Sequence, residues 1–495
     1  MKKILFIPAT VIASLFWNAC TGGIANADLS NTLPPVFPDY FEVTVPVNIT
    51  PLYFQMTDNA TRMFVQAKGA KSGVLETRVR KSAAFKLSDW KQLLEENAGD
   101  SLVITIYAKY KDKGWIQYVP FTLYVNPVPV NRYLVYRLIA PGYEVYSKMG
   151  IYQRDLSSFK EIPLLENTLI PGNCMNCHSF TGNNPENMSL HIRGALGGTI
   201  MKKGEEIEIL NTKTEETIGN CVYPYWHPSG DFVVYSVNKT IQVFHAIEDE
   251  RIEVIDLASD IVVYHPESKK IITTDLLKTN DFETFPSFSP DGKTLYFSSS
   301  SFQKIPDDYQ EIRYNLCSIG FDPQTMTFAN HVDTLVNAAA IGKSISYARP
   351  SPDGKYIMFT LSDYGNFSIW HKEADLWLYD LRDGSLREMK EVNSDDVESY
   401  HSWSSEGTWF VFSSRRLDGL YTRPFFACIN ENGEISKPFL LPQKKPFEFY
   451  NMSFFSYNVP EFVTGLVDWD LKKVEKMLTE GKRDSIEYGN NQNNK

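Results

Sequence analysis

A cysteine pair followed directly by a histidine is the most chemically distinctive feature of this sequence. The stretch "PGNCMNCHSF" (171–180) places Cys174 and Cys177 three positions apart, with His178 next to the second thiol. The chain has only six cysteines in 495 residues. C-x-x-C-H is the attachment signature of c-type haem, in which the thiols become thioethers and the histidine ligates the iron. The motif therefore predicts one covalent haem c held by these three residues.

Two residues after the motif could supply the second axial ligand of the iron. Met188 and His191 follow it across the loop-forming stretch 179–187. They would share a face on a helix, but on a strand they would point to opposite faces, so only one could meet the iron. We expect an extended segment here and favour His191 as the distal ligand. Met188 is the second choice, and an open or water-bound position is the third.

Three other uses of the cysteine pair are weaker than haem attachment. A disulfide between Cys174 and Cys177 would close a loop too short to stabilise the fold much. A zinc site needs four ligands, and only His178 and His191 lie near the pair in sequence. A thioredoxin-like redox pair requires a βαβ frame, which the surrounding pattern lacks. The remaining cysteines of the mature chain are expected to be buried free thiols; they are Cys221, Cys317 and Cys428.

The N-terminus predicts export. A positive start and a short apolar run at residues 4–17 are typical of a signal peptide. Cys20 at the end of this run predicts a lipoprotein-type signal over 1–20, lipidation of the cysteine, and a linker over 21–35. The alternative is ordinary cleavage after Ala27, which would release a soluble periplasmic protein. No later segment is long and apolar enough to span a bilayer.

The composition limits the classes of partner. The formal net charge is −11 with a pI of about 5.4, and there is no cluster of lysine and arginine of the kind that binds phosphate backbones. We therefore expect no nucleic-acid partner and a membrane contact only through a lipid anchor. The 43% hydrophobic and 14% aromatic content is that of a globular protein rich in β-structure.

Residues 36–130 predict a β-sandwich-like domain of immunoglobulin type. Four segments alternate apolar and polar residues as half-buried strands do; they are 41–49, 61–68, 101–110 and 115–125. Between them, Ser88 is expected to cap one helix that ends before Gly99. Residues 131–188 would then form a short haem-binding segment.

From residue 189 the chain repeats itself, and the repeat predicts a β-propeller over 189–467. Four stretches align without gaps, each with an aromatic start, a turn containing glycine, and an alternating strand; they are 223–236, 285–298, 347–360 and 400–413. Their turn glycines are spaced by 62, 62 and 53 residues, as expected for four-stranded blades. We expect five or six blades, with residues 450–462 supplying a first strand that joins 197–210 to close the ring. A short helix capped by Asp468 and a tail complete the chain over 468–495.

The "SPDGK" turns at 289–293 and 351–355 resemble those of TolB-like (WD40-like) propellers. The surroundings of the motif, at 136–159 and 191–199, are similar to a group of bacterial envelope proteins that join a C-x-x-C-H segment to such a propeller. The resemblance implies haem and a periplasmic or outer-membrane location, and it implies no known substrate.

Together these features predict an all-β exported envelope protein that carries haem for electron transfer or redox sensing. Its propeller would dock an envelope protein or a redox partner. The alternative is a non-haem TolB-like propeller that serves as a binding scaffold for a protein or ligand. An enzyme is less favoured, because the chain has neither a G-x-S-x-G elbow nor an H-E-x-x-H zinc motif.

Overall fold

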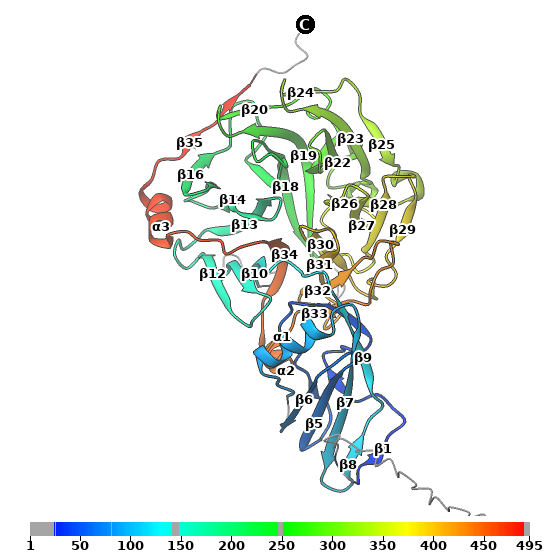
Figure 1. Ribbon diagram of the computed structural model, residues 1–495. Coiled ribbons are helices and arrows are strands. Elements are labelled where there is room, and N and C mark those ends of the chain that lie inside the picture. Colours follow the sequence, from blue (N-terminus) through cyan, green and yellow to red (C-terminus); the bar gives the residue numbers. More distant parts are fainter. Residues whose placement is uncertain (1–23, 25, 81, 141–147, 246–250, 490–495) are drawn as a thin grey trace, which may run out of the picture.

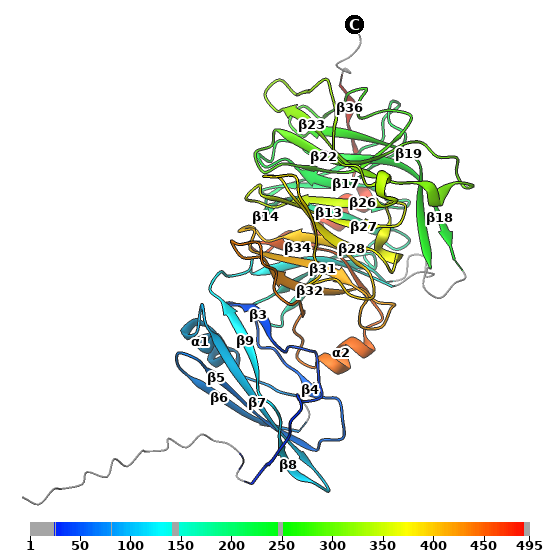
Figure 2. The same ribbon diagram turned by 90° about the vertical axis from the view of Figure 1, so that its right-hand side faces the viewer.

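The computed structural model describes residue 24 and residues 26–80, 82–140, 148–245 and 251–489. Strands dominate, and the body is elongated: a smaller N-terminal region lies at one end of a larger arrangement of sheets (Figures 1 and 2). In this part of the chain no helix is long and apolar enough to cross a membrane. Cys20 lies outside the described residues, so its lipidation stays a prediction.

The N-terminal region is built around one seven-stranded sheet. Its longest strand is β7. On one side β7 pairs with β5, and on the other side its first half pairs with β9 and its second half with β8. The strands are β1 (Asp28–Leu29), β3 (Val43–Pro46), β5 (Arg62–Gly69), β6 (Val74–Val79), β7 (Ser101–Tyr110), β8 (Gly114–Gln117) and β9 (Phe121–Asn126). A separate ribbon joins β2 (Val36–Phe37) to β4 (Gln55–Met56). These pairings do not show the two comparable sheets of an immunoglobulin-type sandwich.

The helix predicted in this region is present with a different start. Helix α1 (Leu87–Glu96) buries Trp90, Leu93 and Leu94 in the core beside the sheet. Lys86 occupies the N-cap position and makes no side-chain cap. The predicted cap at Ser88 is wrong, because its hydroxyl donates to the Asp89 carboxylate instead.

Four separate sheets form much of the larger region, each with four antiparallel strands. The first contains β34 (Ser456–Val463), β10 (Tyr133–Ile139), β11 (Gly150–Asp155) and β12 (Glu161–Glu166). The second contains β13 (Cys174–Thr181), β14 (Asn184–Arg193), β15 (Gly198–Lys203) and β16 (Glu206–Asn211), with β35 (Asp484–Ser485) along its edge. The third contains β26 (Ser344–Pro350), β27 (Tyr356–Ser362), β28 (Asp375–Asp380) and β29 (Leu386–Glu388). The fourth contains β30 (Glu398–Trp403), β31 (Trp409–Ser414), β32 (Arg423–Cys428) and β33 (Phe439–Leu440).

A ten-stranded sheet holds two further units of the same kind. One contains β17 (Cys221–Trp226), β18 (Val233–Phe244), β19 (Ile252–His265) and β20 (Lys270–Ile272), with β36 (Glu487–Tyr488) at its edge. The other contains β21 (Phe282–Phe288), β22 (Thr294–Ser300), β23 (Asn315–Asp322), β24 (Thr327–Phe328) and β25 (Asp333–Val336). The single parallel pair Ser259–Phe282 joins the two units, so each keeps its own antiparallel order.

The first strands of these units surround a common centre in a β-propeller-like arrangement. In chain order β13, β17, β21, β26 and β30 each contact the next, and β34 lies between β30 and β13 (Figure 1). We call these six the inner strands. Strand β34 comes from the C-terminal part of the chain and pairs with β10 from the start of this region, so chain end and chain start are held together in one sheet.

The strand pairings correct two expectations about this region. The predicted C-terminal first strand exists, but β34 pairs with β10 and not with residues 197–210, which belong to β15 and β16. Residues 131–188 were expected to form a separate haem segment, and their strands instead belong to the first two sheets. Both expectations failed for the same reason: the sequence pattern of a strand does not indicate which strand it pairs with when that partner is distant in sequence.

The repeated motif forms the hairpin between the first and second strands of four units. Its glycines adopt positive φ angles of 70–77°, which glycine tolerates without steric strain. In two of the turns the serine hydroxyl donates to the aspartate two residues later, as at Ser289 and Asp291 (2.6 Å). At Gly292 an added Cβ would lie 2.1 Å from the His227 ring, so this turn packs tightly against the neighbouring unit.

The end of the chain runs along the outside of the sheets. Helix α2 (Pro446–Met452) precedes β34. Helix α3 (Leu471–Glu480) is capped by Asp470, whose carboxylate accepts from two backbone N–H groups. The predicted cap at Asp468 is therefore wrong by two residues.

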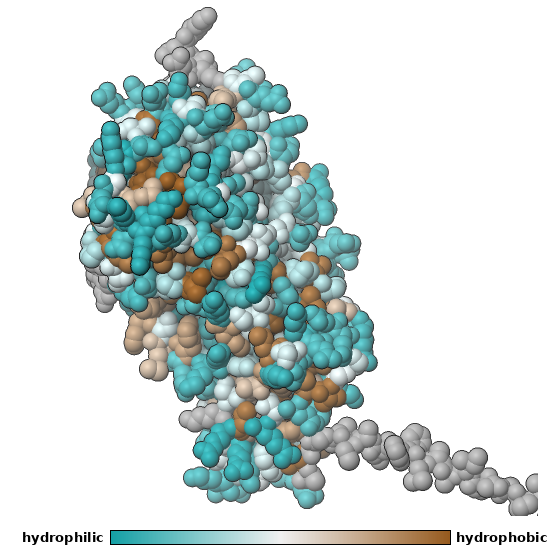
Figure 3. All heavy atoms as spheres, turned by 60° about the vertical axis from the view of Figure 1, so that its left-hand side comes forward, coloured by the Kyte–Doolittle hydropathy of each residue, from teal (hydrophilic) through white to brown (hydrophobic). Residues whose placement is uncertain are grey.

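The face in Figure 3 is largely hydrophilic, and its apolar side chains form small scattered patches, as is ordinary for a globular protein.

Candidate ligand site in the central channel

A layer of aromatic side chains crosses the centre of the ring of inner strands. Tyr223, Phe285, Tyr347 and Tyr400 occupy the same position in β17, β21, β26 and β30, at a bulge where the pairing register shifts. All four have positive φ angles of 47–55°. Ring centroids lie 4.5 Å apart for Tyr223–Phe285, 4.2 Å for Phe285–Tyr347 and 4.9 Å for Tyr347–Tyr400. Tyr223 and Tyr347 also meet, although their strands are not neighbours. We call these four residues the aromatic layer.

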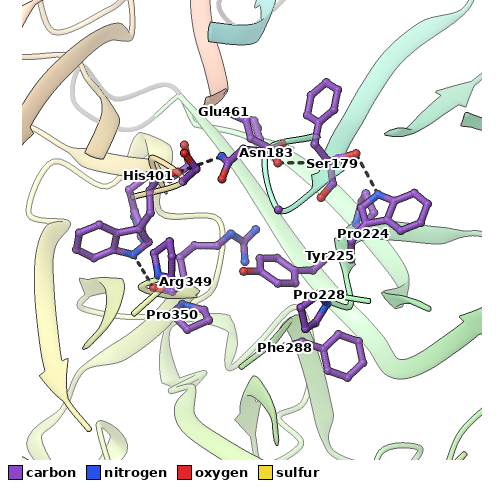
Figure 4. A pocket seen from close by; sticks show the side chains of 18 of the residues that line it. Ser179, Asn183, Pro224, Tyr225, Pro228, Phe288, Arg349, Pro350, His401 and Glu461 are labelled. Carbon is purple, nitrogen blue, oxygen red and sulfur yellow. Dashed lines mark hydrogen bonds between the residues drawn. The ribbon is translucent and has the colours of Figure 1, made fainter. Parts of the chain in front are cut away.

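Two chambers lie on the sides of this layer. The first chamber has a volume of about 290 Å³ and is drawn in Figure 4, and the second has a volume of about 200 Å³. Tyr347 and Tyr400 line both, together with His178, Arg349 and several smaller residues. The chambers therefore adjoin at Tyr347 and Tyr400 of the aromatic layer, and we call the two together the channel.

The first chamber places an arginine near a carboxyl group. Arg349 from β26 stacks on the ring of Tyr225, with its guanidinium carbon 5.2 Å from the ring centroid (Figure 4). Its Nη1 donates to the carbonyl of the adjacent Ala348 (3.0 Å). Glu461 from β34 accepts the backbone N–H of Phe180 at Oε1 (3.0 Å). The two residues hold equivalent positions, each just after the bulge of its strand.

Burial determines the charge of the first chamber. It raises the pKa of Glu461 to about 8, against the smaller opposing effects of the Phe180 N–H and of Arg349. It lowers the pKa of His401 to about 3, and the Nε2–H of this histidine donates to the Met358 carbonyl (2.9 Å). Burial also lowers the pKa of Arg349, but an arginine stays protonated in proteins. At neutral pH the first chamber therefore carries one positive charge.

Tryptophan side chains fix the walls of the first chamber. The Nε1–H of Trp226 donates to the Ser179 carbonyl (3.1 Å), and that of Trp403 donates to the Arg349 carbonyl (3.0 Å). Each bond joins neighbouring inner strands, β17 to β13 and β30 to β26. The backbone that carries Arg349 is thus held in place from the side.

The second chamber is also positive. Three arginines line it, Arg137, Arg193 and Arg349, and no aspartate or glutamate of the described ranges does. The Nη1 of Arg137 donates to Asn176 Oδ1 (2.6 Å). This accumulation of positive charge occurs inside a protein whose formal net charge is −11. The described lining of the channel therefore carries a positive charge, whereas the net charge of the whole protein is negative.

The C-x-x-C-H residues lie on an inner strand, β13, and not on a helical turn. Its register with β14 pairs Cys174 with Arg193 and His178 with Leu190, and Asn176 and Cys177 form the bulge between them. Because side chains alternate along a strand and a bulge sets two residues opposite one, both cysteines face β17 while His178 faces the other way. Both thiols accordingly line the second chamber with Tyr223 of β17.

This arrangement does not fit haem c. The thioethers and the iron ligand must act on one porphyrin, whereas along β13 the thiols and the imidazole project from opposite faces and share only the wall of the second chamber, about 200 Å³ in volume. His178 is only 3% exposed, and burial lowers its pKa to about 3. Its ring lies near the carbonyls of Val135 and Val459, but neither ring nitrogen makes a hydrogen bond of normal geometry. The chambers beside it are small, at about 290 and 200 Å³.

The two candidates for the distal ligand are not positioned for that role. His191 lies on the opposite face of the sheet from His178, and its Nδ1 is paired with the Thr199 hydroxyl (3.1 Å). Burial lowers the pKa of His191 to about 3. Met188 is the register partner of Phe180 and packs with it in the hydrophobic core. The geometry thus supports neither side chain as a second iron ligand.

The other predicted cysteine roles have mixed outcomes. Across the described ranges no three His, Cys, Asp or Glu residues gather as metal ligands, so the zinc alternative gains no support. Cys221, Cys317 and Cys428 are buried free thiols, as predicted. Cys174 and Cys177 are also unpaired, and of the five described cysteines only Cys174 is not buried.

The charged residues of the channel were missed by the sequence analysis. Arg349 occupies a position of the aligned repeats that holds Tyr225, Ser287 and Ser402 in the other three. A charged residue at an otherwise uncharged position of a repeat is a signal that could have identified it. No comparable signal exists for Arg137, Arg193 or Glu461, because their strands lack the repeated motif.

Comparisons with known proteins give no family. No family model matches this chain, and no curated protein matches it either. Among solved structures, the periplasmic gluconolactonase of Pseudomonas aeruginosa is 11% identical over 63% of this chain and 68% of its own, with a TM-score of 0.26. Prolyl oligopeptidase B from Galerina marginata is 10% identical over 80% and 54%, with a TM-score of 0.35. An oligogalacturonate lyase is 10% identical over 83% and 99%, with a TM-score of 0.28. These scores carry no argument about activity.

Proposed function

We propose that this chain is a binding protein whose central channel takes a small anionic ligand. One observation carries the proposal: in the described part of the chain, three arginines and a single carboxyl group, with a pKa of about 8, line the two chambers. The remainder of the protein is acidic. A positive cleft in a negative molecule favours anions locally while repelling them elsewhere.

Arg349 is the residue that we expect to hold the ligand. Among the described residues, no carboxylate lies within ion-pair distance (4.0 Å) of its guanidinium. A guanidinium taken out of bulk water without a charged partner is unfavourable, and a bound anion would offset that cost. Arginine binds carboxylate, phosphate and sulfate groups through two parallel hydrogen bonds.

Glu461 would assist by staying protonated. With a pKa of about 8, its carboxyl group is mainly neutral at pH 7 and can donate a hydrogen bond to the same anion. The volume of about 290 Å³ is at the lower end of small-molecule sites. We therefore propose a ligand of metabolite size that bears a carboxylate, phosphate or sulfate group.

We further infer that the six antiparallel units are the blades of one closed propeller, which β34 completes from the C-terminal side. Its role would be that of a non-haem scaffold rather than a haem-bearing electron carrier, because the strand geometry of Cys174, Cys177 and His178 does not fit haem c. Export, a lipid anchor at Cys20 and a periplasmic or outer-membrane location belong to this proposal on the evidence of the N-terminal sequence. So does an envelope partner for the propeller.

Thermal unfolding with millimolar sulfate tests the proposal. Binding to the folded state raises the unfolding temperature, so sulfate should stabilise the natural protein more than sodium chloride of equal ionic strength does. Arg349→Met should remove this difference, and Arg349→Lys should keep part of it. The control is Arg382→Met, since Arg382 pairs with Asp380 on the surface (2.6 Å). Equal sulfate effects in the natural protein and Arg349→Met, or none with sulfate, phosphate or citrate, would contradict an anion site.

A further inference from the structure

We propose that Cys174 is a modification site: a thiol that exchanges with small anionic disulfides, which the arginines of the second chamber attract. The inference shares with the proposed function the positive charge of the channel, but it concerns another chamber, other residues and a covalent step. It also gives the C-x-x-C-H motif a role that does not require haem.

Access distinguishes Cys174 from the other described cysteines. It is partly exposed, whereas Cys177, Cys221, Cys317 and Cys428 are buried. Cys174 lies at the start of β13 and lines the second chamber. A thiol must be reachable to attack a disulfide, so among these residues only Cys174 meets the first requirement for exchange.

Positive charge surrounds this thiol. Arg193 is its direct partner across the β13–β14 pair, which places their Cβ atoms roughly 5 Å apart. Arg193 is exposed, so its guanidinium is free to meet an incoming reagent. Arg137 contributes from β10, where its bond to Asn176 (2.6 Å) holds it beside the motif. Among the residues that the structure describes, no acidic one lines the chamber, and the field of these residues therefore favours an anionic reagent.

A polar group whose nitrogens make no hydrogen bond of normal geometry also borders this space. The His178 ring lines both chambers and is 3% exposed, and neither of its nitrogens makes a hydrogen bond of normal geometry. Buried polar atoms are nearly always satisfied by protein, water or ligand. An occupant of the chamber would satisfy His178 as well as the arginines.

The exchange is balanced without a further oxidant. The Cys174 thiolate attacks one sulfur of the anionic disulfide, the reagent's S–S bond breaks, and a new S–S bond joins Cys174 to half of the reagent. The other half leaves as a thiolate. Cys174 is thereby oxidised to a mixed disulfide and the departing sulfur is reduced.

Cys177 is not placed to displace the attached group. It is 9% exposed, whereas Cys174 is partly exposed. A second thiol must reach the mixed disulfide to displace the attached group, and burial restricts the access of the Cys177 thiol. Exchange should stop at the mixed disulfide on Cys174.

Two chromogenic reagents of different charge test the proposal. The dianion 5,5′-dithiobis(2-nitrobenzoate) and the neutral 4,4′-dithiodipyridine are each mixed with folded protein carrying Cys20→Ala, and thiolate release is followed. Rates are divided by those of free cysteine to remove intrinsic reactivity. We expect one equivalent per chain with the dianion and a clear preference for it over the neutral reagent. Cys174→Ser should abolish the reaction, and Cys177→Ser should leave it unchanged.

Arg193→Gln gives the decisive comparison. Loss of one nearby positive charge should lower the rate of reaction with the dianion about fivefold and change the rate with the neutral reagent by less than about twofold. Added salt should also lower the rate with the dianion selectively, because it screens the arginine charge. Equal slowing of both reagents, no charge preference, or labelling that depends on Cys177 would overturn the inference. The proposed function fails separately: Cys174→Ser should keep the sulfate effect that Arg349→Met removes.

Discussion

The four units with the repeated turn motif and the two without it build different parts of the channel. In the four repeated units the bulge of the inner strand carries an aromatic residue, and these four side chains form the aromatic layer. In the other two, the equivalent residues are Val459 on β34 and Asn176 on β13. The aromatic layer is therefore incomplete on the side of β34 and β13.

This difference explains where the reactive residues of the channel lie. Where the bulge residue is not aromatic, space remains, and next to it stand His178, Cys177 and Glu461. Arg349 is the exception, because it comes from a repeated unit and reaches the chambers from the opposite wall. The repeated units thus supply mainly the aromatic side chains that pack in the channel. The two units without the motif supply most of its ionisable and thiol side chains.

Removing β34, which lies between β30 and β13, should have the largest effect. Deletion of everything after Pro446 removes β34, which pairs with β10 over most of its length, and so exposes sheet edges that favour aggregation. We expect no soluble, cooperatively folding protein, as judged by size-exclusion chromatography and urea unfolding. Deletion after Gly489 removes none of the paired strands and is the matched control. A soluble and cooperative truncation at Pro446 would show that the unit of β34 and β10 is dispensable.

The repeated half of the fold could be predicted because its signals are local. A serine, an aspartate and a glycine within four residues specify a turn through their own hydrogen bonds and backbone freedom, as at Ser289, Asp291 and Gly292. The alternating strand follows directly. The glycine spacing then implies the propeller. All of this information lies within short stretches of the chain.

The other half could not be predicted in the same way. The pairing of Tyr133 with Val463 joins residues that no local pattern connects, so residues 131–188 looked like a separate segment. The C-x-x-C-H motif specifies only composition and spacing, and its meaning depends on the backbone. Pairing of Cys174 with Arg193 of β14 makes it a strand, which separates the thiols from His178.

The aromatic layer should be a major source of stability in the repeated half. Tyr347 is 5% exposed and contacts the rings of Phe285 and Tyr400. Tyr347→Ala should lower the free energy of unfolding by about 3 kcal/mol, since large cavities in a packed core are costly. Tyr347→Phe keeps the ring and should cost less than about 1 kcal/mol. Urea unfolding measures both, and a loss below about 1 kcal/mol for the alanine variant would mean that the layer is not a packed core.

Glu461 offers a smaller, pH-dependent test of the other half. Its pKa is raised to about 8 in the folded protein from an ordinary value of 4.5, so the folded state holds its proton more tightly. The stability linked to this proton is complete below pH 4.5 and is lost as pH rises towards 8. Relative to Glu461→Gln, the natural protein should therefore become less stable across this window in urea unfolding.

Anion binding should follow the same titration. Above pH 8 the Glu461 carboxylate would face Arg349 with a negative charge, so sulfate affinity should fall several-fold in the natural protein and stay nearly constant in Glu461→Gln. Glu434→Gln is the control, because Glu434 is exposed on the surface. Identical pH profiles for the natural protein and Glu461→Gln would remove Glu461 from the site.

The smallest expected effect concerns the motif that first suggested haem. Covalent haem would require Cys174, Cys177 and His178 to leave β13 and act on one porphyrin, which means breaking the pairing with β14 and extracting a histidine that is 3% exposed. We therefore expect protein exported from a host that matures cytochromes c to lack a Soret band and to give no haem stain after denaturing electrophoresis. Cys174→Ser combined with Cys177→Ser should leave the absorption spectrum and the unfolding midpoint essentially unchanged, since neither thiol forms a disulfide. A reduced α-band that disappears in this double variant would show that the strand is remodelled on maturation. The comparison would then be reversed, because the unit containing β13 would be a cofactor site and not a wall of the channel.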